Sequence, residues 1–459
     1  MERYRGKKVL IVGLGKKGFA LINFFNTLDC QIRVTDIRPI FDLNKQVKRI
    51  KKVNPNPQLT LGEHRDEDFI EADLVIYSSS IDPYLPQLML AREHGREVYS
   101  EFSIAAKYCR RPIIAVCGSH GRTTIATMIA FALRQDKKNV FLGGTSEEPF
   151  INFHLLPNKD EIDYVVVEMS PYQIQGLDTF KPVLAVYPNL DENKIPNRYK
   201  SVSEYLETGL KVAKLLGPDE KIIVNFDRLS GNYAFREMKA TTYWYSRKSF
   251  VDQGVIAELQ GTHFHDKRIH SNINNHSEFV VSKMRVIGME NRENLLAAIS
   301  AVKALGISDQ AIQMLIEKFP GIQNNLEFVV EKNGVKFYND SKSETMPQLE
   351  KTLQSVKEKI ILVAGGKDLE LNYAAYASIV KEKVRVLVLV GECKEAMNRD
   401  LGDHAQTFIV GSFDEGILIA YQKSRTGDTI ILCPGNPSTD VFRDYVEKGA
   451  YYKKLVFQL

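Results

Sequence analysis

The chain has 459 residues and a mass of 52.1 kDa, and about 150 residues per domain predicts roughly three domains. Apolar residues make up 44% and charged residues 26%, which excludes an extensively disordered chain. Lys and Arg total 61 against 57 Asp and Glu, and the resulting net charge of +4 is too small to indicate a dedicated nucleic-acid or membrane-surface binder.

We expect no export signal at the start of the chain, because the charged segment Met1–Lys8 runs directly into the strand-like Val9–Val12. Every apolar run is shorter than the ~20 residues that span a bilayer. The cysteines are scattered without a CxxC pair, a pattern typical of reduced, mostly buried thiols in the cytosol. We therefore expect a cytoplasmic protein; the cysteines are Cys30, Cys109, Cys117, Cys393 and Cys433.

Short apolar runs rich in Val and Ile recur along the chain and alternate with amphipathic stretches. This pattern predicts buried parallel strands in α/β units. Many runs end in Gly, Ser, Asn or Glu, and ligands bind at the carboxyl ends of such strands. The predicted strands are Val9–Val12, Leu74–Tyr77, Ile113–Val116, Tyr164–Val167, Val183–Val186, Ile222–Val224, Ile360–Ala364, Val386–Val390 and Ile430–Leu432.

Two domain boundaries follow from proline and glycine signals. Arg110-Arg111-Pro112 separates a first α/β block from the next strand, because proline disfavours helix at the preceding residue. Phe319-Pro320-Gly321 ends an amphipathic helix at Asp309–Lys318, and a hairpin turn follows at Asn333-Gly334. The hairpin strands are Phe328–Glu331 and Lys336–Tyr338, and the predicted domains are 1–111, 112–320 and 321–459.

The first block contains Gly13-Leu-Gly15-Lys-Lys-Gly18 directly after a strand, and a second strand ends at Asp36. In a GxGxxG turn the glycines let the backbone approach a diphosphate at a helix N-terminus, and the acid accepts a hydrogen bond from a sugar hydroxyl. Three interpretations remain open: a purely structural tight turn, an NAD site, or another nucleotide-sugar site.

The second block opens with the turn Gly118-Ser-His-Gly121-Arg-Thr-Thr124 between a strand and a helix. This geometry predicts a phosphate-binding loop, with a structural strand-to-helix turn as the alternative. The full Walker pattern is absent, because Val116 stands at the first glycine position and Arg122 replaces the lysine.

Four histidines cluster later in the chain, in a polar stretch with little periodicity. We expect a solvated loop here rather than a metal site. The histidines are His263, His265, His270 and His276.

The loop spacing fits the short Gly-[Ser/Thr]-x-Gly-Lys-[Ser/Thr]-[Ser/Thr] motif of the Mur ligases, and further segments match that family in order. The chain resembles these ligases, most closely the MurD branch, which adds D-glutamate to UDP-N-acetylmuramoyl-L-alanine. The matching segments are Phe141–Gly144, Val167–Gln173, Phe180–Pro182, Val186–Asn189, Asn291–Ala298, Asn339–Lys342, Ala364–Asp368 and Cys433–Phe442.

The resemblance implies an α/β protein of three domains: a Rossmann-like UDP-substrate domain, a central P-loop-type ATPase domain and a Rossmann-like C-terminal domain that binds the amino acid. It implies an ATP- and Mg²⁺-dependent ligation in peptidoglycan precursor synthesis, through an acyl phosphate. The partners it implies are a UDP-linked muramoyl precursor and an amino acid, and we expect a monomer without nucleic acid or integral membrane association.

The same resemblance assigns roles to individual residues. The expected catalytic residues are Lys342, Glu168 and Arg122, with Thr123 and Glu168 as magnesium ligands. The expected ATP-binding residues are Gly118, Ser119, His120, Gly121, Arg122, Thr123, Thr124, Asn294 and Asp340; the UDP-substrate residues are Gly15, Thr35, Asp36 and Arg38; the amino-acid residues are Ser438 and Tyr445.

The chain departs from the family at charged positions that the chemistry uses. Arg122 replaces the loop lysine, Lys194 a magnesium-binding histidine, and Gly209 a carbamylated lysine. One hypothesis is that Arg122 and Lys194 supply positive charge that Mg²⁺ supplies elsewhere. The other departures are Thr145 for asparagine, Asn324-Asn325 for His-Arg, Glu344 for threonine and Leu369 for lysine.

These departures leave alternatives open beside the D-glutamate ligase. The first alternative is a paralogue that keeps the fold without catalysis, and the second is a ligase for a different amino acid. An NAD oxidoreductase is disfavoured, because it gives the phosphate loop of the second block no role.

Overall fold

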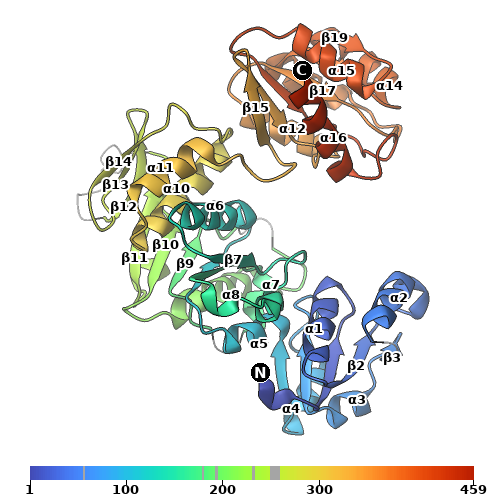
Figure 1. Cartoon of the computed structure of the whole chain (residues 1–459), viewed down its shortest axis with the longest axis vertical. Helices are drawn as coiled ribbons and strands as arrows, with labels where there is room; N and C mark the ends of the chain where they lie inside the picture. Colours follow the sequence, from blue (N-terminus) through green and yellow to red (C-terminus); the bar gives the residue numbers. More distant parts are fainter. Residues whose placement is uncertain (55–56, 178–179, 192–194, 230–232, 249–258) are drawn as a thin grey trace. The chain divides into compact units, whose positions relative to one another are not determined.

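The computed structural model describes residues 1–459 except 55–56, 178–179, 192–194, 230–232 and 249–258. The described residues form two compact units, one of residues 1–279 and 294–312 and the other of residues 280–293 and 313–459. Each unit is built from α/β layers, and the first contains two sheets (Figure 1).

The first sheet is parallel throughout and has the order β3-β2-β1-β4-β5. The chain moves from β1 outward to β3 and then returns to β4, so β1 and β4 flank a topological switch point, where ligands bind in such sheets. The strands are β1 (Lys8–Val12), β2 (Gln31–Asp36), β3 (Gln58–Leu61), β4 (Leu74–Tyr77) and β5 (Glu97–Ser100), and the helices are α1 (Lys16–Asn26), α2 (Asn44–Val53), α3 (Asp66–Glu71), α4 (Pro86–Glu93) and α5 (Glu101–Tyr108).

The central sheet has the order β14-β13-β12-β11-β10-β9-β6-β8-β7. It is parallel from β7 to β12 and turns antiparallel at β12 and β13. Its strands are β6 (Ile113–Val116), β7 (Val140–Gly143), β8 (Tyr164–Glu168), β9 (Leu184–Tyr187), β10 (Lys221–Asn225), β11 (Thr241–Ser246), β12 (Gly261–His265), β13 (Arg268–Ser271) and β14 (Ser277–Val280). The helices are α6 (Arg122–Gln135), α7 (Pro171–Gln175), α8 (Val202–Leu215), α9 (Phe226–Leu229), α10 (Met289–Ala304) and α11 (Asp309–Lys318).

The third sheet has the order β15-β16-β20-β17-β18-β19 and lies in the second unit. Its one antiparallel pair is β15 and β16, joined by Asn333 and Gly334 at φ of 50° and 75°, as a two-residue hairpin requires. The strands are β15 (Glu327–Lys332), β16 (Val335–Asn339), β17 (Ile360–Ala364), β18 (Val384–Leu389), β19 (Gln406–Ile409) and β20 (Thr429–Leu432), and the helices are α12 (Met346–Ser355), α13 (Ala377–Lys383), α14 (Lys394–Leu401), α15 (Phe413–Gln422) and α16 (Tyr445–Gln458).

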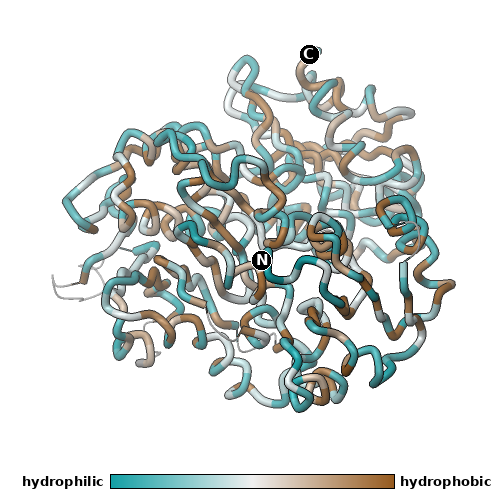
Figure 2. Tube along the Cα trace, turned by 60° about the horizontal axis from the view of Figure 1, so that its bottom comes forward, coloured by the Kyte–Doolittle hydropathy of each residue, from teal (hydrophilic) through white to brown (hydrophobic). Residues whose placement is uncertain are grey.

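Burial explains why these segments form strands. Every residue of β4, β6, β9 and β17 is buried, as expected for central parallel strands covered on both faces. Figure 2 shows that hydrophilic stretches prevail along many of the outer segments of the trace, whereas apolar stretches are frequent in its interior. Among the described residues, none of the helices combines the length and apolarity that crossing a bilayer requires.

The strands that the sequence predicted lie within one or two residues of observed strands, and α11 at Asp309–Lys318 and the hairpin at Asn333-Gly334 were also predicted. One expectation was wrong: the histidine-rich stretch is not a loop. His263 and His265 lie on β12, and His270 lies on β13, where His263 and His270 are cross-strand partners. The strands β12 and β13 are short, so the alternation of apolar and polar residues along them is too brief to be recognised in the sequence.

Candidate functional site

The predicted phosphate loop connects β6 to α6 through two glycines in the left-handed region, Gly118 at φ 99° and Gly121 at φ 81°. Gly121 is the N-cap of α6 and supplies no capping side chain. The first N–H groups of a helix have no partner within it, so the start of α6 presents donors suited to a phosphate. A Cβ at Gly121 would lie 2.7 Å from Oδ1 of Asn294, which places that predicted ATP-binding residue directly against the loop.

Asn189 holds the loop in place from the end of β9. Its Oδ1 accepts hydrogen bonds from the backbone N–H groups of Ser119 at 2.9 Å and His120 at 3.1 Å, and its Nδ2 donates to the His120 carbonyl. The Ser119 hydroxyl also contacts the Tyr205 hydroxyl at 2.5 Å. The sequence offered Asn189 only as the end of a matching segment, without a role. The loop is therefore shaped before any ligand binds.

Arg122 turns its guanidinium back into the loop rather than away from it. Nη1 donates to the carbonyl oxygens of Gly118 and Ser119, the second at 2.7 Å. Burial lowers the pKa of Arg122 from its ordinary value, and the charge of Glu168 works against that shift. In this arrangement Arg122 stabilises the loop backbone and places positive charge beneath it.

The two predicted magnesium ligands lie next to each other. Thr123, in the first turn of α6, donates its hydroxyl hydrogen bond to Oε2 of Glu168, at the end of β8, over 2.8 Å. A hydroxyl and a carboxylate are the hard oxygen ligands that Mg²⁺ prefers. The residues present therefore fit a magnesium ion at the mouth of the phosphate loop.

The segment after β7 completes this edge of the sheet. Gly144 has φ 92° and passes so close to the Glu168 backbone that a Cβ would collide with it. Gln173 Nε2 donates to the Gly144 carbonyl at 2.8 Å. Thr145 accepts from the backbone N–H groups of Glu147 and Glu148, so this departure from the family motif caps a turn.

The glycine at the position of the family's carbamylated lysine lies against a leucine side chain. Gly209 is buried on α8, where a Cβ would lie only 2.8 Å from Cδ2 of Leu190. Lys211, two residues on, donates to the carbonyl oxygens of Gln175 and Leu177 and so caps the end of α7. Neither position brings a lysine to the phosphate loop. Lys194, the replacement for a magnesium-binding histidine, lies outside the described residues.

The first glycine turn connects β1 to α1. A different physical reason accounts for the glycine at each of its three glycine positions. Gly13 has φ 96°, and a Cβ on Gly18 would collide with the Gly13 carbonyl, so both are required by the fold. A Cβ on Gly15 would meet no atom of the described part of the chain within 4 Å. Packing alone does not require a glycine there, and the open space lies at the N-terminus of α1. Gly15 therefore leaves room for a ligand at the switch point.

Asp36 is buried, and both of its carboxylate oxygens accept hydrogen bonds from neighbouring residues. Oδ2 accepts from the Leu14 N–H at 2.7 Å and from Nη2 of Arg38, and Oδ1 accepts from the N–H and Nε of Arg38. Burial works to raise the pKa of Asp36, but the hydrogen bonds from Arg38 and Leu14 outweigh it and hold the pKa below its ordinary value. These bonds use the carboxylate's four acceptor positions. Asp36 thus fixes Arg38, whose side chain is 46% exposed.

Other polar groups surround the switch point. Thr35 bonds through its hydroxyl to the Glu63 carbonyl and to Nδ1 of His64. Lys17, inside the glycine motif, is buried, with Nζ 3.1 Å from the Ser79 hydroxyl and 3.5 Å from Oε2 of Glu101. Lys17 was not predicted as a site residue, although its place between two motif glycines was the available signal.

The remaining predicted residues lie in the second unit. Asp340 is buried: Oδ1 accepts from the Leu326 N–H, and Oδ2 accepts from the Thr352 hydroxyl at 2.6 Å. Burial raises the pKa of Asp340. Lys342, two residues on, is exposed and bonded through its backbone N–H to the Asn324 carbonyl. Asp340 therefore shapes the turn, and Lys342 projects from it.

Ser438 and Tyr445, the predicted amino-acid residues, follow β20 in the second unit. The Ser438 N–H donates to Oε1 of Glu344 at 2.7 Å, and its buried Oγ has no hydrogen-bond partner among the described residues. Tyr445 is half-buried as the first residue of α16. Glu344, a departure from the family, is thus in contact with the predicted amino-acid site, whereas Leu369 is exposed.

Three family models match successive parts of the chain. The MurD-like N-terminal domain of Mur ligases matches residues 7–100, the Mur ligase middle domain residues 116–302, and the Mur ligase glutamate ligase domain residues 326–436.

Curated proteins named UDP-N-acetylmuramoylalanine–D-glutamate ligase are similar over almost the full length. The protein from Bdellovibrio bacteriovorus is 34% identical over 98% of this chain and 97% of its own. The protein from Pelobacter propionicus is 31% identical over 97% of each.

Solved structures share the fold at low identity. A UDP-N-acetylmuramoyl-L-alanyl-D-glutamate–2,6-diaminopimelate ligase aligns with a TM-score of 0.59 at 16% identity, over 84% of this chain and 92% of that chain. UDP-N-acetylmuramate-alanine ligase MurC from Thermotoga maritima aligns with a TM-score of 0.53 at 15% identity, over 98% of this chain and 99% of that chain.

Proposed function

We propose that this chain, which belongs to the Mur ligase family, joins D-glutamate to UDP-N-acetylmuramoyl-L-alanine with conversion of ATP to ADP and phosphate. The observation that carries the proposal is the full-length similarity to D-glutamate ligases together with the pairing of Thr123 and Glu168 beside the glycine loop. The free cysteine thiols support a reducing, cytoplasmic setting.

The reaction proceeds in three steps. The substrate carboxylate attacks the γ-phosphorus, an O–P bond forms, and the bond to ADP breaks. The amine of the amino acid then attacks the acyl carbon and loses a proton as the C–N bond forms. The tetrahedral intermediate collapses and phosphate leaves. Each step moves negative charge, so fixed positive groups and N–H donors provide most of the stabilisation.

The phosphate loop serves this chemistry through its preformed shape. The N–H groups at the start of α6 bind the phosphates, and Asn189 and Arg122 keep the loop backbone from moving as charge shifts. The Thr123 hydroxyl and the Glu168 carboxylate would hold Mg²⁺, which would offset the negative charge of the phosphates. Asn294, against Gly121, contributes to the nucleotide site.

The other partners bind elsewhere on the chain. The nucleotide of the UDP substrate binds at the open space over Gly15, next to Arg38 and Thr35. Ser438 and Tyr445 bind the amino acid, and Lys342 contacts the reacting phosphoryl or acyl group. Because Gly209 is packed against Leu190, the reaction proceeds without a lysine at that position.

The test is amide formation in solution. The protein is incubated with ATP, Mg²⁺ and UDP-N-acetylmuramoyl-L-alanine, with D-glutamate and a panel of other D- and L-amino acids, and both phosphate and the ligated product are measured. We expect phosphate and product with D-glutamate. Lys342→Ala abolishes both, whereas Lys357→Ala, which removes an exposed lysine in the same unit, leaves them unchanged.

Two outcomes contradict the proposal. Product with another amino acid and none with D-glutamate moves the chain to a different ligase activity. No phosphate release under any condition, beside an active ligase of the family, establishes a non-catalytic paralogue.

A further inference from the structure

The histidine-rich hairpin at the edge of the central sheet places metal-binding groups on one face. His263 and His270 are directly opposite each other on β12 and β13, so their side chains lie on the same face of the sheet. The opposite face is the core side, where Ile269 and Phe279 are buried. This edge therefore presents a polar face that packing of the sheet does not explain.

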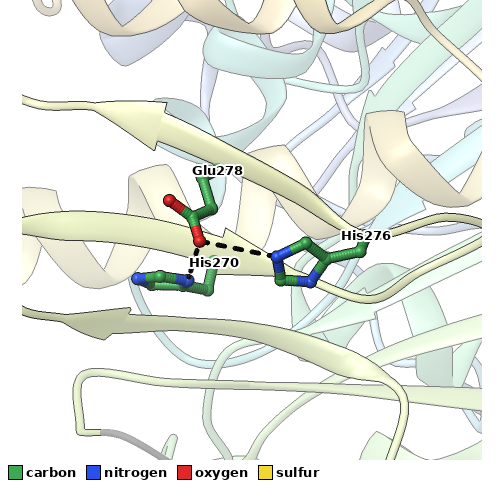
Figure 3. A group of neighbouring side chains, drawn as sticks. All are labelled: His270, His276 and Glu278. Atoms are coloured by element: carbon green, nitrogen blue, oxygen red, sulfur yellow. Dashed lines mark ion pairs between the residues drawn. The ribbon is translucent and has the colours of Figure 1, made fainter.

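We propose that His270, His276 and Glu278 form a zinc-binding site at this edge, separate from the phosphate loop. One ligand atom from each of the three residues lies within 4.8 Å of the others. Nδ1 of His270 is 3.4 Å and Nε2 of His276 is 3.5 Å from the same oxygen, Oε1 of Glu278 (Figure 3). Ligands about 2.0–2.2 Å from a tetrahedral zinc ion are separated by roughly this distance.

The two oxygens of Glu278 have different surroundings, which is the arrangement of a metal-binding carboxylate. Oε1 faces both histidines, whereas Oε2 is bound by Nη1 of Arg268 at 3.3 Å. Hydrogen bonds that hold the second atom of a ligating side chain fix its orientation and are a regular part of metal sites. Arg268 thus orients Glu278 and leaves Oε1 directed at the histidine nitrogens.

The turn that carries His276 is anchored rather than loose. The buried Lys303 donates from Nζ to Oδ1 of Asn275 at 2.7 Å and to the Ser277 hydroxyl at 2.9 Å. Asn274 in turn donates to the Lys303 carbonyl. His276 is therefore flanked by two anchored residues, so the three ligands come together without folding a flexible segment.

The donor set identifies the class of ion. Two imidazole nitrogens and one carboxylate oxygen suit Zn²⁺ and similar transition metals better than Mg²⁺, which prefers oxygen ligands. Three protein ligands leave a fourth position for water. A bound ion would join β13 to β14 across their turn, and binding to the folded state alone raises thermal stability.

The competing explanation is an ion-pair cluster in which protonated histidines and Arg268 neutralise Glu278. It needs no metal and predicts no specific zinc binding. The two explanations differ in stoichiometry and in the response to substitutions at the three ligands.

The experiment is a titration of the full-length, tag-free, chelator-treated protein with Zn²⁺ against a chromophoric chelator, with Mg²⁺ in excess to occupy oxygen-rich sites. Co²⁺ absorption reports coordination geometry, and thermal unfolding is measured with and without Zn²⁺. We expect one equivalent of Zn²⁺, tetrahedral Co²⁺ bands and a raised Tm. His276→Gln and Glu278→Gln weaken zinc binding by about tenfold or more.

His94→Gln, at an exposed histidine on the first sheet's side of the unit, is the matched control and keeps the zinc equivalent. Unchanged zinc binding in both His276→Gln and Glu278→Gln overturns the site, as does the absence of stoichiometric binding in the wild-type chain. The readouts do not use ligase activity, so they stand apart from the proposed function. Because His276 is 69% exposed and Glu278 40% exposed, both variants are expected to fold, and the unfolding curves without zinc verify it.

Discussion

The two glycine turns of the first unit follow the same plan of strand, turn and helix, yet different charged groups surround them. In the turn after β1, the buried carboxylate of Asp36 already accepts the Leu14 N–H. In the turn after β6, the neutral Asn189 amide braces the loop, and Arg122 supplies positive charge beneath it. In the first turn Arg38 pairs with Asp36 and Lys17 with Glu101, so the charges balance, whereas Arg122 donates to backbone carbonyl oxygens and its positive charge favours an anion.

Because the charged groups around the two turns differ, the glycine pattern alone does not identify the ligand. The same backbone geometry suits the uncharged part of a nucleotide in one turn and a phosphate chain in the other. The charged groups that decide between these ligands come from elsewhere in the sequence, from the ends of β2 and β9.

The largest effect is expected at the phosphate turn. Glu168→Gln removes the charge beside Thr123 and should lower turnover about 100-fold, the magnitude typical of removing one electrostatic stabiliser. The Mg²⁺ dependence of the rate should shift to higher concentration. Glu207→Gln, at an exposed acid on α8, is the control and should have no effect. Unchanged turnover and unchanged Mg²⁺ dependence in Glu168→Gln would remove this residue from the site.

Gly121→Ala separates backbone strain from contact with the site. Gly95→Ala has the same left-handed strain at φ 71° but open space around the Cβ. Each variant should lose about 1–2 kcal/mol of unfolding free energy. Only Gly121→Ala should also raise KM for ATP, about tenfold, because its Cβ displaces Asn294 and the loop. Equal KM values in the two variants would show that the loop does not hold ATP.

Gly15→Ala tests the first turn. Since its Cβ would meet none of the described residues within 4 Å, the unfolding free energy should change by less than about 0.5 kcal/mol. The new methyl occupies the space given to the ligand, so KM for the UDP substrate should rise about fivefold, equivalent to roughly 1 kcal/mol. Gly18→Ala, which collides with Gly13, should instead lower stability. A destabilised Gly15→Ala with normal KM would assign the turn a structural role only.

The smallest effect is a pH dependence at Asp36. Its folded pKa lies below the ordinary value of 3.8, so its contribution to stability is present above that value and is lost as pH falls through the folded pKa. Asp36→Asn should therefore be about 1 kcal/mol less stable than wild type at neutral pH, and the difference should shrink below pH 3.8. Exposed Asp42→Asn is the control. A difference that does not change with pH would exclude a charged Asp36.

The sequence was sufficient for the parts of the fold that rest on local signals. Buried β-branched runs predicted the central strands, and Asn333-Gly334 predicted a hairpin because few other residues adopt its left-handed dihedral angles. The family resemblance, rather than a local signal, predicted Thr123 and Glu168 as magnesium ligands, and the structure brings the two side chains into contact.

What could not be predicted depends on contacts between distant segments. Asn189 braces the phosphate loop across 70 residues, and the packing of Gly209 depends on Leu190. The acceptor capacity of Asp36 is used by Arg38 and Leu14, which no spacing rule reveals. The histidine hairpin was mistaken for a loop because its strands are too short to show alternation.

The most direct test of whether the two turns bind different ligands is to measure the binding of both ligands to a variant of each turn. Affinities for ADP with Mg²⁺ and for UDP-N-acetylmuramoyl-L-alanine are measured on wild type, Gly121→Ala and Gly15→Ala. We expect Gly121→Ala to weaken binding of the adenine nucleotide only and Gly15→Ala to weaken binding of the UDP substrate only. Loss of both ligands in either variant, or the reverse pairing, would contradict it.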